Sequence, residues 1–339
     1  MDKENTIISV RPLGFQWFTK DPFLFCAHHN DHYPKGNGKM GPLASLAGRN
    51  MGSDFDERNK WRMYHGLDVP GFPVHPHRGF ETVTIALKGF IDHSDSTGCA
   101  GRYGNGDVQW MTAGEGVQHS EMFPLLSTEE DNPLELFQVW LNLPRAKKMV
   151  KPYFKMLWKD TIPNIPVTDE GGKTSNVILI SGHAHGRTVE SPSPDSWASA
   201  IDNEVLIMRV TTPPIARYKL APSKKGVNRM LYYYQGGNAT FNGVKIESGN
   251  AVELDPVDEL EFVNGDKESK FLILQGKPIN EPVVQYGPFV MNTTEEIQAT
   301  IADYRRTSFG GWPWPQEEQV HGTRSRFARY ADKTEDIPQ

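Results

Sequence analysis

Two short segments of this sequence place histidines and carboxylates at spacings that suit a metal ion. In the first, one residue separates His75 from His77, and Glu81 follows at matching parity. Alternate residues of a β-strand project from the same face, so the two imidazoles would point together. Further along the chain, His119 and Glu121 repeat the two-residue spacing. Two imidazoles from one strand, with a histidine and a carboxylate from another, would form a mixed nitrogen and oxygen site.

Such a donor set restricts the metal that it would hold. Neutral imidazole nitrogens and a carboxylate suit Fe(II), Mn, Ni, Co or Zn better than Ca²⁺ or a thiolate-seeking ion. With four protein ligands on an octahedral ion, two positions stay open for a substrate or O2. The two histidines of a single His-x-His in a strand are more often half-buried polar residues than metal ligands. The ligand interpretation therefore depends on the second pair, His119 and Glu121. Pro76 lacks a backbone donor, which predicts an edge or bulged strand.

The residues around these pairs predict short strands separated by turns. In the first half, β-rich runs lie at 82–87, 107–111 and 134–141. Similar runs in the second half lie at 176–180, 204–210, 229–234 and 270–274. Prolines and basic residues between 144 and 166 indicate a linker. The pattern favours an all-β protein with barrels or sandwiches in a duplicated arrangement.

Local signals predict one hairpin and one helix. Asn242-Gly243 is typical of a two-residue hairpin turn. Thr293 and Glu296 have the spacing of a helix capping box. The apolar residues that follow at helical spacing are Ile297, Ile301 and Tyr304. The tail at 310–315 cannot continue the helix, and we expect its tryptophans to pack on a domain surface.

Composition excludes several classes of protein. The 339 residues predict two domains, at roughly 150 residues for each. Lys and Arg total 36 against 42 Asp and Glu, and this net charge of −6 disfavours direct binding of nucleic acid. The 31 glycines and 25 prolines indicate many turns. No apolar run reaches the ~18 residues of a membrane span, so we expect no membrane partner.

The cysteines and the first residues bear on the compartment. The two cysteines, Cys26 and Cys99, exclude a disulfide scaffold and a cysteine-based zinc site. We expect each to be a small packed side chain. The first residues lack the basic patch and apolar run of a signal peptide, so a reducing, cytoplasmic location is expected.

Longer motifs around the two histidine pairs resemble the pirin family of the cupin superfamily. The matching segments are 75–83, 106–114, 119–122, 138–144, 281–283 and 286–292. The resemblance implies two packed cupin barrels, which are double-stranded β-helices, with one non-haem metal in the N-terminal barrel. We therefore expect a metal-binding barrel over 1–150, a metal-free barrel over 165–290, and a helix and tail over 291–339.

The resemblance also implies the identity of the ligands, which are His75, His77, His119 and Glu121. The general cupin pattern would instead give the carboxylate position to Glu81. In the pirin pattern Glu81 becomes a supporting residue that orients a ligand imidazole or pairs with Arg78. The implied cofactor is one divalent metal, Fe(II) foremost, with Mn, Ni, Co and Zn as alternatives.

Two further groups of histidines lie outside these motifs. The first falls in 22–71, a stretch longer than the family's usual loop, and comprises His28, His29 and His32. We expect a solvated loop there, with a cover over the site entrance as the alternative. The second comprises His183 and His185 with Glu190. A partner histidine for that group would fall in 247–266, which contains none, and this predicts a metal-free second barrel.

Two functions are associated with the resemblance. The first is an oxidoreductase that opens a flavonol such as quercetin with O2, for which Glu121 would accept the proton of the flavonol hydroxyl. Candidates for apolar walls are Phe72, Phe80, Trp110 and Met111, although ordinary barrel core is the favoured interpretation. The second function is a metal- or redox-dependent transcription cofactor that acts through contacts with a protein partner. A cupin enzyme with an unrelated small substrate is a third interpretation.

Overall fold

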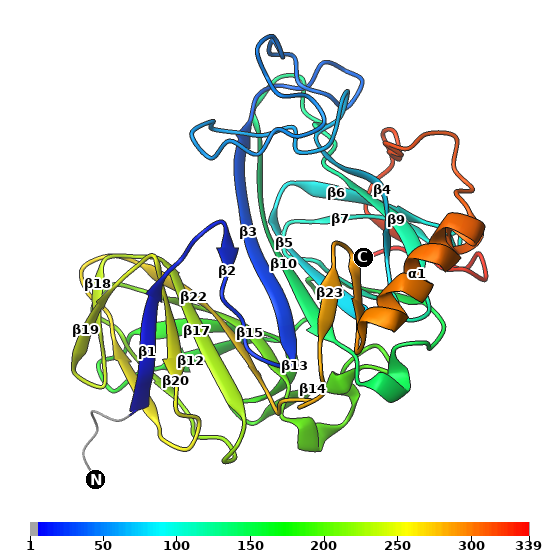
Figure 1. Cartoon of the computed structure of the whole chain (residues 1–339). Helices are drawn as coiled ribbons and strands as arrows, with labels where there is room; N and C mark the ends of the chain where they lie inside the picture. Colours follow the sequence, from blue (N-terminus) through cyan, green and yellow to red (C-terminus); the bar gives the residue numbers. More distant parts are fainter. Residues whose placement is uncertain (1–5, 339) are drawn as a thin grey trace. The chain divides into compact units, whose positions relative to one another are not determined.

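The computed structural model describes residues 6–338, and these residues are built mainly from β-strands (Figure 1). The chain is divided into two compact units. The N-terminal barrel consists of residues 28–160 and 281–338, and the C-terminal barrel consists of 6–27 and 161–280. Each unit is built around two larger antiparallel sheets, so the all-β fold class with two barrels is confirmed. Each also combines two separate segments, whereas the division expected from the sequence uses continuous ones.

Two antiparallel sheets form the N-terminal barrel. The first contains, in spatial order, β11 (Tyr153–Leu157), β8 (Val108–Thr112), β5 (Phe80–Lys88), β10 (Asn132–Asn142) and the later part of β3 (Phe23–Tyr33). The second contains β26 (Glu335–Asp336), β25 (Phe327–Arg329), β7 (Ala100–Gly104), β6 (Phe90–Asp95), β9 (Val117–Met122) and β4 (Gly71–His77). β11 lies inside the expected linker, because it pairs with β8 and buries Phe154 and Met156.

The centre of the first sheet is the strand pair β5 and β10. β5 contains the predicted strand 82–87, and residues 80–86 are all buried. It pairs with β10 along its length and with β8 on its other side. This burial explains why the sequence of β5 is so rich in β-branched and aromatic residues, since such side chains pack well on a covered sheet.

The C-terminal barrel also has two sheets. The larger contains β1 (Ile7–Pro12), β20 (Asn250–Leu254), β17 (Asn228–Gln235), β22 (Ser269–Gly276), β15 (Leu206–Thr212), β13 (Thr174–Ala184) and β12 (Asn164–Thr168), with β14 (Arg187–Val189) beside β13. The smaller contains β16 (Arg217–Leu220), β21 (Leu260–Val263), β18 (Asn238–Phe241) and β19 (Val244–Glu247). The short β2 (Gln16–Trp17) pairs with the beginning of β3.

The predicted hairpin and the C-terminal barrel core are both present. Asn242 and Gly243 join β18 to β19 with φ of 46° and 88°, as a two-residue turn with left-handed backbone requires. The apolar faces of the two sheets enclose a core that includes Tyr233, Phe241 and Phe271. Short 3-10 helices in the chain lie at Arg145–Lys147, Trp197–Ser199, Ile201–Asn203 and Ser308–Gly310.

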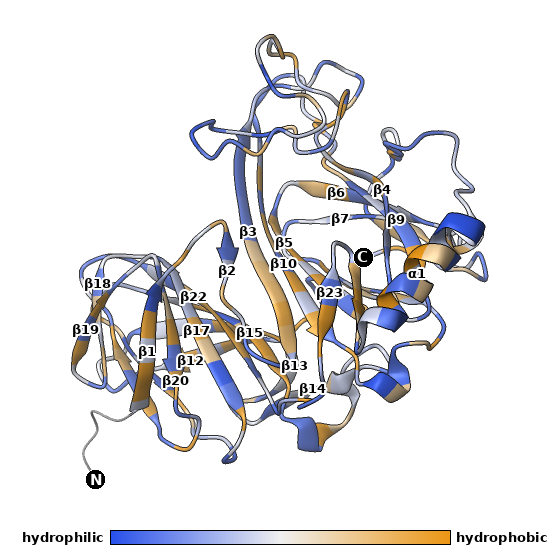
Figure 2. Ribbon diagram, viewed as in Figure 1, coloured by the Kyte–Doolittle hydropathy of each residue, from blue (hydrophilic) through white to orange (hydrophobic). Residues whose placement is uncertain are grey.

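The helix α1 (Thr294–Thr307) and the tail belong to the N-terminal barrel. The Thr293 side chain caps Glu296 N–H and the Glu296 carboxylate returns to the Thr293 N–H, so the predicted capping box is confirmed. α1 follows the hairpin of β23 (Val284–Tyr286) and β24 (Phe289–Met291). Its hydrophobic and hydrophilic residues are segregated (Figure 2), and Ile297 is among the buried ones. In the tail, Trp314 Nε1 donates to Asp95 O at 2.8 Å, and β25 pairs with β7.

Two simple expectations concern membranes and cysteines. Among residues 6–338, no helix has the length and apolar character needed to cross a bilayer. Cys26 and Cys99 are both free thiols and both buried, as expected for small packed side chains.

Candidate metal centre

The three predicted histidine ligands meet on two paired strands, β4 and β9. His75 lies directly opposite His119 in the antiparallel register, and His77 follows two positions along β4. The ring centroids are 4.4 Å apart for His75 and His119 and 4.9 Å apart for His77 and His119. One nitrogen of each imidazole lies within 4.8 Å of the others. β4 is the last strand of its sheet and is bulged between Phe72 and His75, as Pro76 predicted.

Hydrogen bonds to backbone carbonyls orient the two imidazoles of β4. His75 Nδ1 lies 2.8 Å from Pro73 O, and His77 Nδ1 lies 3.4 Å from Pro288 O. A carbonyl only accepts, so Nδ1 carries the proton in both rings and Nε2 keeps its lone pair. This is the tautomer in which metal-binding histidines are commonly held.

His119 provides the test of whether a metal fits these residues. It is completely buried, and neither of its ring nitrogens has a hydrogen-bond partner. Leaving a buried polar atom unsatisfied costs about 1–3 kcal/mol. A metal ion coordinated by His119 would remove this cost, and the neighbouring Nε2 atoms of His75 and His77 would complete a three-imidazole set. The donor set therefore fits a divalent transition metal.

The protonation state of the three histidines agrees with this role. Burial lowers the pKa of His75 to about 4, and burial also places the pKa values of His77 and His119 well below the usual range. In all three rings the charge of a nearby imidazole lowers the pKa further. All three rings are thus neutral at physiological pH, which is the form that binds metals.

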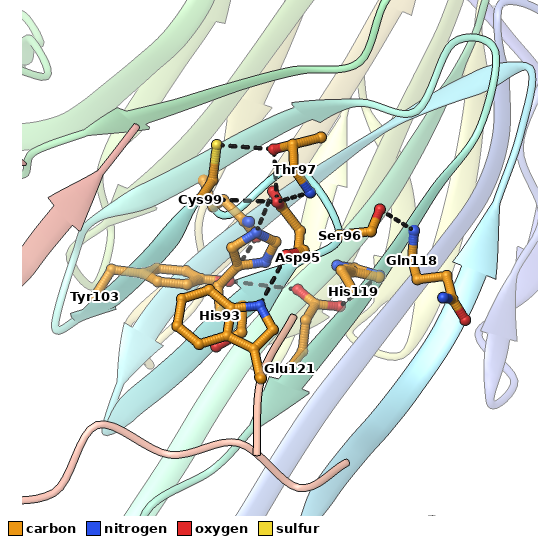
Figure 3. A network of polar contacts seen from close by, with 12 residues as sticks. His93, Asp95, Ser96, Thr97, Cys99, Tyr103, Gln118, His119 and Glu121 are labelled. Carbon is orange, nitrogen blue, oxygen red and sulfur yellow. Dashed lines mark hydrogen bonds and ion pairs between the residues drawn. The ribbon is translucent and has the colours of Figure 1, made fainter. Parts of the chain in front are cut away.

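Glu121 lies beside the histidines and is held by other groups. Its Oε2 atom is 4.0 Å from His119 Nε2. Thr84 Oγ1 donates to Oε1 at 2.9 Å and Gln138 Nε2 donates to Oε2 at 3.1 Å, while Tyr103 OH lies 3.4 Å from Oε1. Figure 3 shows the Tyr103 phenol and the His119 imidazole both directed toward this carboxylate. Burial raises the pKa of Glu121.

A further buried histidine, His93, borders the site without having been predicted. It lies opposite Glu121 in the β6–β9 register, and its ring centroid is 5.5 Å from that of His119. His93 Nε2 lies 3.1 Å from Asp95 Oδ2 (Figure 3). The His93 ring stacks on Phe154, with the ring centroids 4.8 Å apart. The pattern His-x-Asp in a strand was the one local signal for it.

Glu81 and Arg78 occupy different surroundings. Glu81 is fully buried and accepts hydrogen bonds from Trp110 Nε1 at 3.1 Å and Thr112 Oγ1 at 2.7 Å. Arg78 forms its ion pair with Asp303 of α1 at 2.5 Å. The helix thus supplies a carboxylate for Arg78, and the pairing of Arg78 with Glu81 stays a prediction. This helix lies more than two hundred residues further along the chain, beyond the reach of any local pattern.

Aromatic side chains surround the imidazoles. The ring of Phe72 lies 6.3 Å from His75, and the ring of Phe80 lies 5.0 Å from His77. Trp140, which the sequence reasoning missed, lies 5.4 Å from His77. Trp110 and Met111 are buried core residues, as favoured.

Two of the histidines that the sequence analysis singled out in 22–71 have hydrogen-bond partners of their own. His28 and His29 lie on β3, so this part of 22–71 is a strand where we expected a solvated loop. His28 Nε2 lies 3.2 Å from Glu135, and His29 Nδ1 lies 2.8 Å from Tyr64 OH. His32 is exposed. Burial alternates along the later part of β3, as expected for a strand with one covered face. The many polar residues of this segment did not indicate such a strand.

In the C-terminal barrel, the second His-x-His pair diverges. His183 Nδ1 lies 2.9 Å from Thr188 Oγ1, whereas His185 Nε2 lies 2.8 Å from Tyr218 OH. His185 has a φ of 47° and follows the end of β13, so the two side chains do not share a strand face. The absence of a metal from this barrel stays a prediction.

Comparisons with known proteins identify the family. A family model described as Pirin matches residues 16–141, and one described as Pirin C-terminal cupin domain matches 207–310. Human pirin is 38% identical over 249 residues, which cover 71% of this chain and 78% of pirin. A Pseudomonas aeruginosa protein provisionally named quercetin 2,3-dioxygenase is 36% identical over 241 residues, covering 70% of this chain and 79% of that protein.

A solved structure gives the same result for the fold. The crystal structure of a quercetin 2,3-dioxygenase from Acinetobacter baumannii superimposes with a TM-score of 0.70 at 26% sequence identity. The match covers 90% of this chain and 98% of that enzyme. With both barrels matched by family models and the histidine motifs in place, the chain belongs to the pirin family of the cupin superfamily.

Proposed function

We propose that this protein is a metal-dependent dioxygenase that opens a flavonol such as quercetin with O2. The metal would be one divalent ion, Fe(II) foremost, held by His75, His77 and His119 with Glu121 as the carboxylate. The observation that carries the proposal is His119, which is buried without a partner beside two imidazoles already oriented by backbone carbonyls. The similarity to a solved quercetin 2,3-dioxygenase supports the reaction class.

Each group around the site has a role in this proposal. When bound, the metal supplies a Lewis acid and a template for the two reactants. Glu121 would accept the flavonol hydroxyl proton at Oε2, the oxygen nearer to His119. Thr84 and Gln138 hold the carboxylate in place through their hydrogen bonds. The ring of Phe72 beside His75 would face the flat aromatic substrate, and the fully buried Phe80 beside His77 would exclude water.

The test is a turnover assay with defined metal. The full chain is stripped of metal, loaded anaerobically with Fe(II), and mixed with quercetin and air. We expect O2 uptake that matches the loss of flavonol absorbance, and neither change with metal-free protein. The His119→Ala variant, carried through the same loading, serves as the control for metal bound elsewhere.

Two outcomes would contradict the proposal. No turnover above the metal-free protein with Fe(II), Mn, Ni, Co or Zn would exclude the dioxygenase. If the metal nevertheless binds, a metal- or redox-dependent regulatory role through a protein partner becomes the favoured function. Turnover that persists in His119→Ala would place the reaction outside this site.

Cys26 and Cys99 are free thiols, which agrees with the cytoplasmic location that we propose.

A further inference from the structure

The C-terminal barrel contains a cavity of about 740 Å³ that the proposed function does not use. Its walls come from β13 to β17 and β22 and from the two 3-10 helices near residue 200. This volume lies in the range of small-molecule sites, about 300–1,000 Å³. Apolar side chains form part of the lining, and they are Val189, Ile201, Val205, Leu206 and Leu220.

Arg229 lines this cavity and is only 2% exposed. Among residues 6–338, three other arginines are buried, and each pairs with an aspartate: Arg62 with Asp31, Arg78 with Asp303, and Arg102 with Asp92. In the same part of the chain, no carboxylate lies within 4.0 Å of Arg229. Arg229 is thus the buried arginine whose charge the protein does not compensate directly.

Neutral oxygens position the Arg229 guanidinium. Nε donates to Gln275 Oε1 at 2.7 Å, and one terminal nitrogen donates to Ala221 O at 3.0 Å. A guanidinium has five N–H groups, so these two bonds leave donors for another partner. Burial lowers the pKa of Arg229 to about 10, and the side chain stays charged at neutral pH. Burying a charge without a counter-ion is costly, and an anion in the cavity would offset that cost.

The carboxylates on the cavity wall already have other partners. Glu204 lies 2.9 Å from Lys224 Nζ, and Glu259 lies 3.4 Å from Lys219 Nζ. Glu190 lies at the exposed rim, so Arg229 is the buried charged residue among those that line the cavity.

We propose that the C-terminal barrel binds a small organic monocarboxylate, whose carboxylate pairs with Arg229 and whose apolar body fills the cavity. A planar guanidinium matches the two oxygens of a carboxylate, which explains the use of arginine here. One buried guanidinium held by neutral oxygens matches a monoanion, and the aliphatic walls match a ligand with a hydrocarbon or aromatic body. The site is separate from the histidine cluster and does not depend on the dioxygenase proposal.

Calorimetric titration of the full chain tests the proposal, with acetate, benzoate and 3,4-dihydroxybenzoate as probes. We expect benzoate or its dihydroxy analogue to bind more tightly than acetate, which lacks an apolar body. Benzamide, the neutral counterpart of benzoate, should bind at least about tenfold more weakly. Arg229→Gln should weaken carboxylate binding by at least about tenfold. Arg217→Gln is the matched control, because Arg217 lies exposed on β16 and pairs with Glu261.

A second variant guards against misfolding of Arg229→Gln. Ala198 lines the cavity and is half-buried, so Ala198→Phe would fill the space while leaving Arg229 in place. It should abolish binding while thermal unfolding stays cooperative. The proposal is overturned if none of the three carboxylates binds at millimolar concentration, or if benzamide binds as tightly as benzoate. Preferential binding of inorganic phosphate, or undiminished benzoate binding in Ala198→Phe, would likewise contradict it.

Discussion

The two barrels each contain a His-x-His pair, and their surroundings differ in one decisive respect. In the N-terminal barrel, β9 pairs with β4 and places His119 directly opposite His75. In the C-terminal barrel, His183 and His185 sit where β13 ends, and each bonds to a separate hydroxyl, on Thr188 and Tyr218. In the first arrangement the imidazole nitrogens face one another. In the second, each imidazole bonds to a different hydroxyl and the two rings share no partner.

The difference shows that the pairing strand brings the three imidazoles together and that the motif alone does not. Strand parity can bring two side chains to one face, but a third ligand must come from a strand whose register is set by the rest of the barrel. The two barrels also differ in buried charge. The histidine cluster is neutral, while the cavity of the C-terminal barrel contains the buried cation of Arg229. We therefore expect one barrel to bind a metal and the other an anion.

The largest expected effect follows removal of the imidazole from β9. His119→Ala should weaken metal binding by more than about 100-fold, because losing a mere supporting residue already costs up to that much. His185→Ala is the matched control, since it removes an imidazole from the other pair. Metal content after anaerobic loading with Fe(II) and dialysis measures both. Equal metal content in the two variants would contradict the prediction that the N-terminal barrel binds the metal through His119.

The next effect separates the two carboxylates that the sequence left as alternatives. Glu121→Gln should lower quercetin turnover by at least about 100-fold, because it removes the proposed base next to His119. Glu81→Gln should retain turnover within about threefold, since a Gln oxygen can still accept from Trp110 and Thr112. Initial rates of flavonol loss, normalised to bound metal, give the comparison. The opposite ranking would assign the carboxylate role to Glu81, as the general cupin pattern does.

Strand parity and family motifs were sufficient to predict the histidine cluster, because His75 and His77 are two residues apart on one strand. The groups that complete the site were not predictable in this way. Pro288, which accepts from His77, lies 211 residues along the chain, and Gln138 reaches Glu121 from another sheet. Such contacts depend on barrel closure and register, which no local spacing encodes. β11 was not predicted for a related reason. Its lysine-bearing sequence resembles a linker, and its strand conformation depends on pairing with β8.

The smallest effect concerns a buried histidine outside either pair, His29 on β3. Burial, with the nearby Arg62 charge, lowers the pKa of His29 to about 3 from an unfolded value near 6.5. The folded state therefore excludes a proton that the unfolded chain binds, so stability is full above pH 6.5 and falls as the pH drops toward 3. Between pH 7 and pH 5 this loss is about 2 kcal/mol.

His29→Asn should remove that loss, because asparagine can hydrogen-bond Tyr64 OH and has no proton to bind in this range. Urea unfolding of the N-terminal barrel at pH 7 and pH 5 measures it. The wild-type chain should lose more stability than the variant by about 2 kcal/mol. His32→Asn removes an exposed imidazole from the same strand and controls for changes in β3 itself. If His29→Asn and the wild type lose the same stability on acidification, His29 is not a buried neutral histidine.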